Sequence, residues 1–221
     1  MKKVQQHLTE GIELDDVIGQ IPTSIKNSAL LYRSFNNSYG TLRDVGKSQV
    51  RKGRTPIDTP IALHKLFDEV FYEQHKMKPR SDSLFCSKSL QVAKNYADNV
   101  DDIYVIIPMG AKYIYSHKIL DLFQTFKDHS LEVLCKTFGV PTDNAPKKTL
   151  VQIAKNNTLF DSNIETIKAL FVEMVKTYTI TSTLNQCPKV GEIMVVCDDF
   201  YYINLMMVDT YEVKTYADLE K

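Results

Sequence analysis

The sequence has no tryptophan, only four cysteines and no excess of either charge. Lys and Arg together number 27, as do Asp and Glu, so the formal net charge is zero. This balance excludes a polybasic coat for nucleic acid, although a local basic groove stays open. Of the 221 residues, 43% are hydrophobic and 24% are charged, which excludes disorder of the whole chain. We expect one domain over residues 1–221, large enough to fold without metal or disulfide support.

The few cysteines and histidines show no spacing typical of a metal or redox site. No two cysteines form a C-x-x-C pair, and no two histidines form an H-x-x-x-H pair. The polar segment 1–9 is not typical of a signal peptide, and the longest apolar runs, such as 105–108, are too short to span a bilayer. The sequence therefore predicts a cytoplasmic protein with reduced, buried thiols, no metal and no membrane partner.

The hydrophobic pattern predicts an α+β domain. β-branched and aromatic runs predict strands, and apolar residues three and four positions apart predict helices. The polar segment 36–56 is expected to be a long loop. The expected strands are 29–32, 83–86, 103–107, 193–196, 201–207 and 211–216, and the expected helices follow residues 58–60 and cover 90–97, 119–126, 131–138, 147–154 and 163–178. Strands thus flank a helical insertion at about 112–180, which does not fit a repeating β-α unit.

Two charged residues stand at the ends of expected strands, where a rigid element can aim a side chain into a cleft. Arg33 follows an apolar strand, and its fork of donors suits a diphosphate or a carboxylate. The alternative is an arginine that reaches solvent or pairs with an aspartate. Glu192 precedes the apolar run 193–196, where a carboxylate is costly unless it is paired or used. The alternative is an exposed glutamate at the start of a strand.

A serine pair forms a third candidate site. Ser87 and Ser89 flank Lys88, and on an extended backbone both hydroxyls would point to the same side. One hydroxyl would then hold a ligand while the other orients a carboxylate. The alternative is that either serine only caps the helix expected from Leu90.

Taken in order, these motifs resemble a known enzyme family. An aromatic-Arg pair ends the first strand, Phe-x-Ser-x-Ser at 85–89 leads into a helix, a strand ends in Pro-x-Gly at 108–110, and Glu-Ile-Met-Val at 192–195 precedes Phe-Tyr-x-Ile at 200–203. This order resembles the Arg–Ser–Glu class of ADP-ribosyltransferases, which includes bacterial toxins and phage-encoded enzymes. The resemblance implies a split two-sheet core around an NAD cleft, with the helical insertion before the last strands.

The resemblance also implies roles for single residues. Arg33 would grip the NAD phosphates, and Ser87 would position the nicotinamide ribose and Glu192. Glu192 would accept a hydrogen bond from the ribose 2′-hydroxyl and act as the catalytic carboxylate while nicotinamide leaves. The remaining contacts to NAD would come from the backbone of Ser34, from Ser89, and from Phe85 or Tyr39 stacking on nicotinamide.

The acceptor of ADP-ribose stays open between a protein side chain and a nucleobase. Val190 stands where members that modify side chains commonly carry Glu or Gln, so arginine is not indicated as the acceptor. A basic segment would either contact a nucleic-acid backbone or form a solvated loop; it contains Arg43, Lys47, Arg51, Lys52 and Arg54. The small size resembles phage or toxin–antitoxin effectors, which also admits an antitoxin or host factor as partner.

Two other functions stay open. The first is a non-catalytic inhibitor that docks on a host factor through the helices of 116–178. The second is an NAD glycohydrolase, for which water is the acceptor. The transferase chemistry that the resemblance implies uses NAD as substrate and requires no metal.

Overall fold

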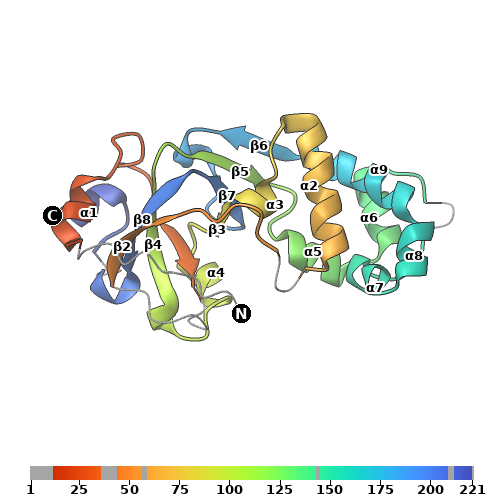
Figure 1. Ribbon diagram of the computed structural model, residues 1–221, viewed down its shortest axis with the longest axis horizontal. Coiled ribbons are helices and arrows are strands. Elements are labelled where there is room, and N and C mark those ends of the chain that lie inside the picture. The colour runs from red at the N-terminus through yellow and green to blue at the C-terminus, as the bar shows by residue number, and fades with distance from the viewer. Residues whose placement is uncertain (1–11, 36–43, 56–58, 143–144, 209–211, 221) are drawn as a thin grey trace.

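The chain forms two antiparallel four-stranded sheets and a group of helices, as the α+β prediction requires (Figure 1). The computed structural model describes residues 12–35, 44–55, 59–142, 145–208 and 212–220. The first sheet has the order β1-β4-β8-β2, with strands Leu31–Ser34, Ile103–Pro108, Asp199–Asn204 and Val45–Gln49. The second has the order β3-β7-β5-β6, with strands Leu84–Cys86, Ile193–Val196, Lys112–Ser116 and Tyr178–Thr181.

A backbone bridge between Tyr32 and Ser87 joins the two sheets. The Tyr32 N–H donates to the Ser87 carbonyl at 2.7 Å, and the Ser87 N–H donates to the Tyr32 carbonyl at 2.9 Å. The bridge ties β1 of the first sheet to the residue that directly follows β3 of the second. It therefore fixes where the ends of these two strands lie relative to each other.

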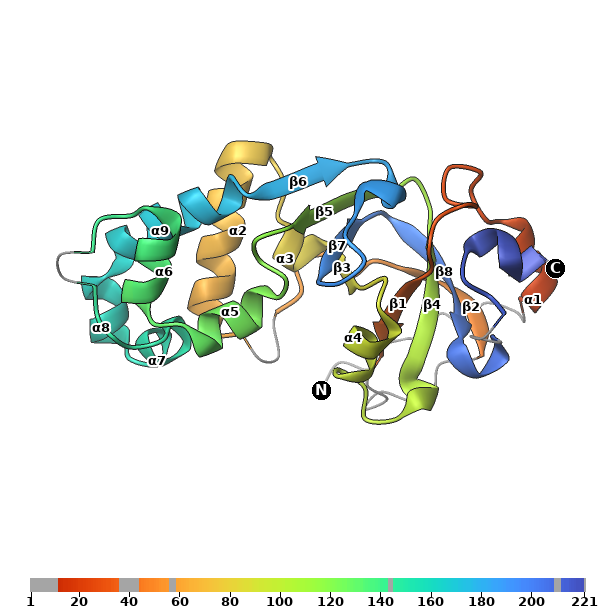
Figure 2. The ribbon, with the colours of Figure 1, turned by 180° about the vertical axis from the view of Figure 1, so that it is seen from behind.

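A group of helices gathers at one end of the molecule, away from the first sheet (Figures 1 and 2). They are α2 Ile61–His75, α5 Leu122–Asp128, α6 Leu131–Phe138, α7 Leu150–Ala154, α8 Asn157–Ser162 and α9 Ile164–Val175. Side-chain oxygens of the residue before each helix accept a backbone N–H at α5, α6, α7 and α8, which satisfies donors that the first turn leaves open. Gly139 ends α6 with φ of 73°, a left-handed conformation that favours glycine.

Short helices complete the chain. They are α1 Leu14–Gly19, α3 Pro79–Asp82 and α4 Leu90–Lys94, with 3-10 turns η1 Val100–Asp102, η2 Leu184–Gln186, η3 Leu205–Met207 and η4 Tyr216–Glu220. Among the described residues, no helix combines the length and the apolar composition that crossing a bilayer requires.

The second sheet separates two hydrophobic cores. Ile193 and Val195 of β7 pack into the core shared with the first sheet, whereas Met194 packs into the core of the helices. This alternation follows from the two-residue period of a strand. Glu192 lies two residues before Met194, and Phe85 is the register partner of Met194. Both therefore belong to the face that the helices cover.

Most of the expected elements are confirmed, but several boundaries were wrong. The segment expected to be a loop, 36–56, contains β2, which pairs with β8 from Val45↔Ile203 to Gln49↔Asp199. The strand expected at 211–216 is absent over the described residues 212–216, where only Thr215 bridges to Ala29 and Tyr216 begins η4. The strand expected over 201–207 is β8 Asp199–Asn204 followed by η3.

The helical insertion expected at about 112–180 is bounded by strands. It begins with β5 and ends in β6, which pair with each other from Tyr113↔Thr181 to Ser116↔Tyr178. Helices therefore occupy only the span between them, from α5 to α9, and α2 joins them from an earlier part of the chain by packing against α9.

Candidate active site at the junction of the two sheets

The junction of the sheets brings Arg33, Ser87 and Glu192 onto adjoining stretches of backbone. Strands β3 and β7 pair with Cys86 opposite Ile193, and Ser87 and Glu192 are the residues directly after β3 and directly before β7. The backbone bridge between Tyr32 and Ser87 places Arg33, the next residue of β1, beside the end of β3. Backbone segments from three distant parts of the sequence thus adjoin here, while the three side chains bond to different partners.

Arg33 is held by the backbone of β3. Its Nη1 donates to the carbonyl of Phe85 at 2.9 Å, and its guanidinium carbon lies 5.0 Å from the centre of the Phe35 ring. Burial lowers the pKa of Arg33, and the negative charge of Glu192 acts in the opposite direction. Among the described residues no aspartate pairs with Arg33, and its guanidinium turns to the backbone of β3; the sequence had left solvent exposure or an aspartate partner as alternatives.

The side chains of Ser87 and Ser89 have different hydrogen-bond partners and do not act as the pair that the sequence predicted. Ser89 caps α4, because its side chain accepts a hydrogen bond from the Val92 N–H at 3.3 Å. The Ser87 side chain is 3% exposed and accepts from the Ser89 N–H at 3.1 Å. Lys88 points elsewhere and donates to the Cys187 carbonyl at 2.8 Å. The cap interpretation is thus confirmed for Ser89, while Ser87 stays at the junction.

Glu192 is mostly buried and paired. Its two carboxylate oxygens lie 3.3 Å and 3.4 Å from Nη1 of Arg80, and the Arg80 and Glu192 side chains are 7% and 19% exposed. Burial raises the pKa of Glu192, and the charge of Arg80 counteracts this shift. The alternative of an exposed glutamate is therefore wrong. Within the described residues, no hydrogen bond joins the Ser87 hydroxyl to this carboxylate, although the family resemblance implied one.

Arg80 is a site residue that sequence reasoning missed. It lies on α3, where its N–H donates to Asp68 Oδ1 at 2.8 Å and its Nη2 donates to Thr59 Oγ1 at 3.2 Å. Its guanidinium carbon lies 4.4 Å from the centre of the Phe85 ring. Its neighbours in the sequence, Lys78 and Asp82, are charged and gave no sign that this arginine is buried.

Arg54, which the sequence placed in the basic segment, also lies at the junction. Its guanidinium carbon lies 4.1 Å from the centre of the Phe85 ring, and its Nε donates to the Arg80 carbonyl at 3.1 Å. Burial, together with repulsion from Arg33 and Arg80, lowers the pKa of Arg54 to about 9. The guanidinium groups of Arg54 and Arg80 therefore occupy the surroundings of the ring that was expected to stack on nicotinamide. Tyr39, the other stacking candidate, lies outside the described residues.

The basic segment does not form one continuous surface. Lys47 pairs with Asp199 at 2.5 Å and Lys52 with Asp198 at 3.5 Å, while Arg54 turns inward. Arg51 is exposed, and Arg43 lies outside the described residues. The charges of Lys47 and Lys52 are thus already compensated, which weakens the case for a nucleic-acid backbone along this segment.

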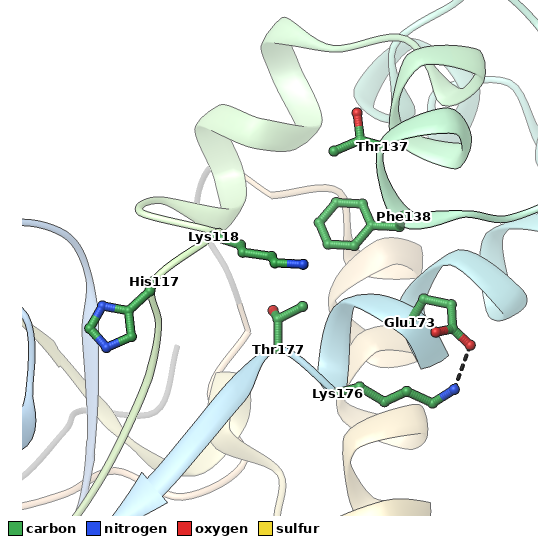
Figure 3. Close-up of a pocket in the computed structure, with 7 residues that line it drawn as sticks. All are labelled: His117, Lys118, Thr137, Phe138, Glu173, Lys176 and Thr177. Atoms are coloured by element: carbon green, nitrogen blue, oxygen red, sulfur yellow. Dashed lines mark hydrogen bonds and ion pairs between the residues drawn. The ribbon is translucent and has the colours of Figure 1, made fainter.

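Two surface cavities lie elsewhere. The larger, about 420 Å³, is bordered by Lys118 and Phe138 and by the Glu173–Lys176 ion pair, where the helices meet β5 and β6. Figure 3 shows Lys118 extending between Phe138 and Thr177. The smaller, about 370 Å³, lies near Tyr72 and Lys78. None of the predicted site residues lines either of them.

The donors at the junction suit an anion. The described residues contain no group of three or more His, Cys, Asp or Glu side chains arranged to hold a metal ion. Cys86, Cys135, Cys187 and Cys197 are buried and free, as expected from their spacing. What gathers around Phe85 is a set of guanidinium groups with one carboxylate, and such forks match the oxygens of phosphate and carboxylate groups.

The comparisons with known proteins give no independent guide to this site. The chain matches no model of a known protein family, no curated protein and no solved structure.

Proposed function

We propose that this protein is a mono-ADP-ribosyltransferase that cleaves NAD at the nicotinamide–ribose bond and transfers ADP-ribose to a macromolecular acceptor. The observation that carries the proposal is the meeting of Arg33, Ser87 and Glu192 at the bridge between two four-stranded sheets. Their order in the sequence and their place at the ends of β1, β3 and β7 agree with the family that the motifs resemble. In this proposal, the junction is the NAD cleft of a split two-sheet core.

The chemistry needs a carboxylate that stays ionised beside the ribose. When the bond between ribose and nicotinamide breaks, nicotinamide leaves with the bonding electrons and positive charge spreads over the ribose C–O bond. A fixed carboxylate stabilises that charge as it develops, which lowers the barrier. The acceptor then adds to the sugar carbon and releases a proton. Arg80 supports this role because its charge opposes the rise in the pKa of Glu192 that burial causes.

The pair with Arg80 leaves Glu192 able to accept a further hydrogen bond. A carboxylate has about four lone-pair sites, and the Arg80 contacts of 3.3 Å and 3.4 Å use one on each oxygen. These contacts are also longer than the roughly 2.7–2.9 Å typical of strong N–H···O⁻ bonds. A ribose 2′-hydroxyl can therefore donate to Glu192 while Arg80 stays in place.

Ser87 also keeps a proton to donate. Its oxygen accepts from the Ser89 N–H, which leaves the hydroxyl hydrogen for a second partner. Within the described residues, no protein acceptor takes that hydrogen. In the proposed complex the Ser87 hydroxyl donates to the ribose or to Glu192, which is the role that the resemblance implies.

The acceptor is proposed only as a class, either a protein side chain or a nucleobase. Val190 is 52% exposed, and Gly191 has φ of 113°, so the loop before β7 presents an apolar side chain two residues before Glu192. This loop offers no carboxylate or amide at that position to engage an arginine. An enzyme of this kind would act in the cytoplasm of a bacterium as a phage or toxin–antitoxin effector, with an antitoxin or host factor as a further partner.

Labelled NAD tests the proposal. The protein is incubated with NAD labelled in the adenylate part, with and without a bacterial extract, and released nicotinamide is measured together with label in the protein, DNA and RNA fractions. We expect nicotinamide release and label in one macromolecular fraction. Free ADP-ribose alone would instead identify an NAD glycohydrolase. A folded protein that releases no nicotinamide under either condition would support a non-catalytic binding protein.

A further inference from the structure

Arginines from three separate parts of the chain converge around Phe85. Arg33 lies on β1, Arg54 follows β2, and Arg80 lies on α3. Arg33 donates to the Phe85 carbonyl, and the guanidinium carbons of Arg54 and Arg80 lie 4.1 Å and 4.4 Å from the centre of its ring. We call Arg33, Arg54 and Arg80 the arginine cluster.

Each member of the cluster has a buried donor without an acceptor. Nε of Arg33, Nη2 of Arg54 and Nε of Arg80 are inaccessible to solvent and have no hydrogen-bond partner among the residues that the structure describes. A buried N–H without an acceptor costs roughly 1–3 kcal/mol, and more when the group is charged. Three such donors around one ring are unusual, because folded proteins leave few buried polar atoms unsatisfied. The arrangement becomes favourable if a ligand supplies the acceptors.

The net positive charge of the arginine cluster indicates that such a ligand would be negatively charged. Glu192 pairs with Arg80, and Asp68 accepts from the Arg80 N–H and the Ser81 hydroxyl. His64 contributes no charge at neutral pH, because burial and nearby cations lower its pKa to about 4. The three positive guanidinium groups thus outnumber these two carboxylates, and neither carboxylate forms an ion pair with Arg33 or Arg54. This excess of positive charge also explains why Arg33 and Arg80 lower the pKa of Arg54.

We propose that Arg54 and Arg80 extend the site at Arg33 into a binding site for the diphosphate group of a small molecule, with Arg54 as the principal new ligand residue. Forked guanidinium donors match phosphate oxygens. Three arginines from separate parts of the chain offer enough donors for the oxygens of two linked phosphates, whereas a single arginine fork matches one phosphate. Arg80 is only 6% exposed, its guanidinium lies over the Phe85 ring, and its Nη1 donates to Glu192. Arg80 therefore forms the inner end of the site. This inference rests on the proposed function for the identity of the ligand, because NAD contains a diphosphate group.

Inorganic pyrophosphate is the direct probe, because it binds without any cleavage of NAD. Its binding to the wild-type protein, to Arg54→Gln and to Lys52→Gln is measured by titration calorimetry at constant ionic strength. Lys52 is the matched control, since it lies two residues away, is 51% exposed and pairs with Asp198 at the surface. We expect saturable binding to the wild type, a loss of about ten-fold or more in Arg54→Gln, and little change in Lys52→Gln.

Two results would overturn the site. One is the absence of saturable pyrophosphate binding to the folded wild-type protein, and the other is equal weakening by Arg54→Gln and Lys52→Gln. If Arg54→Gln does not fold, Arg54→Lys replaces it; this variant keeps the charge and removes the fork, and wild-type affinity there would also contradict the assignment. Competition by ADP-ribose against pyrophosphate then asks whether a dinucleotide is the source of the diphosphate.

The test separates this inference from the proposed function. Pyrophosphate binding that depends on Arg54, together with no cleavage of NAD, would keep the diphosphate site and reject the transferase. Cleavage of NAD with no pyrophosphate binding and normal kinetics in Arg54→Gln would reject the site and keep the transferase.

Discussion

Arg80 holds the carboxylate of Glu192 through a single nitrogen, Nη1, although the two residues are 112 positions apart in the sequence. The pair is mostly buried, and Arg80 is itself fixed by Asp68 and Thr59. Arg80 thereby couples the segment between α2 and β3 to the start of β7. It also sets the electrostatic environment of the proposed catalytic carboxylate.

Removal of Arg80 should shift the pH dependence of NAD cleavage. The charge of Arg80 lowers the pKa of Glu192 against the effect of burial, so Arg80→Gln should raise that pKa further. Glu192 acts as a carboxylate, and activity is therefore lost as the pH falls through its pKa. We expect the acidic limb of the kcat/KM profile to move to higher pH. Arg51→Gln, at an exposed position, is the control, and an unshifted limb in Arg80→Gln would show that Arg80 does not tune Glu192.

The same substitution should destabilise the fold. Breaking a buried ion pair by removing one partner costs roughly 3–5 kcal/mol, because the other charge stays buried without a partner. Urea unfolding of Arg80→Gln should show this loss at neutral pH. A second substitution, Glu192→Gln, should recover part of the lost stability by removing the uncompensated carboxylate. Additive losses in the double variant would argue against the pair.

The two serines should separate catalysis from capping. Ser87→Ala removes the hydroxyl at the junction but keeps the backbone bridge to Tyr32, so nicotinamide release should fall by about a hundredfold with little change in folding. Ser89→Ala removes the N-cap of α4 and should cost about 1 kcal/mol of stability while NAD cleavage is retained. Steady-state kinetics and thermal unfolding of both variants test this division. Equal rates in the two variants would contradict it.

Stability should fall as the pH decreases from neutral, because His64 is buried in its neutral form. Its pKa is about 4 in the folded protein and about 6.5 when unfolded, so the unfolded chain binds more protons between these values. The contribution is complete above about pH 6.5 and is lost as the pH falls towards 4, for a total on the order of 3 kcal/mol. The groups that face or influence His64 are Asp68, Ser81, Arg80, Arg54 and Lys65.

Comparison with His64→Gln isolates this effect. Burial raises the pKa of Asp68, so Asp68 acts in the opposite direction and stabilises the folded state as the pH falls. Glutamine does not titrate and can keep a hydrogen bond to the Ser81 hydroxyl. Urea midpoints measured from pH 7 to pH 4.5 should therefore fall more steeply in the wild type than in His64→Gln. Parallel slopes would show that His64 is not the titrating group.

Much of the fold follows from local sequence patterns. The strand over Ile193–Val196 and the helix over Leu131–Phe138 have the predicted bounds, because their apolar periodicity is unbroken and their ends carry a turn or a glycine. Strand β2 escaped prediction because Val45–Gln49 contains glycine and polar residues and owes its conformation to pairing with β8. A partner that is distant in the sequence leaves no local signal.

For the candidate site, the sequence predicted only the motif residues. The order of Arg33, Ser87 and Glu192 led us to expect them together, and the structure shows that their backbone segments adjoin. Arg54 and Arg80 were missed because a buried arginine has the same local sequence as an exposed one. Its burial depends on Phe85 and Glu192, which lie elsewhere in the chain, and a single sequence does not show that contact.

Release of nicotinamide from NAD by the wild-type protein and by Glu192→Gln tests the central claim most directly. Glu69→Gln serves as the matched control, since Glu69 is exposed on α2. We predict measurable release by the wild type and by Glu69→Gln, and a rate lower by about a hundredfold to a thousandfold in folded Glu192→Gln. Equal release by all three proteins, or none by the folded wild type with bacterial extract present, would contradict the assignment of Glu192 and of the transferase.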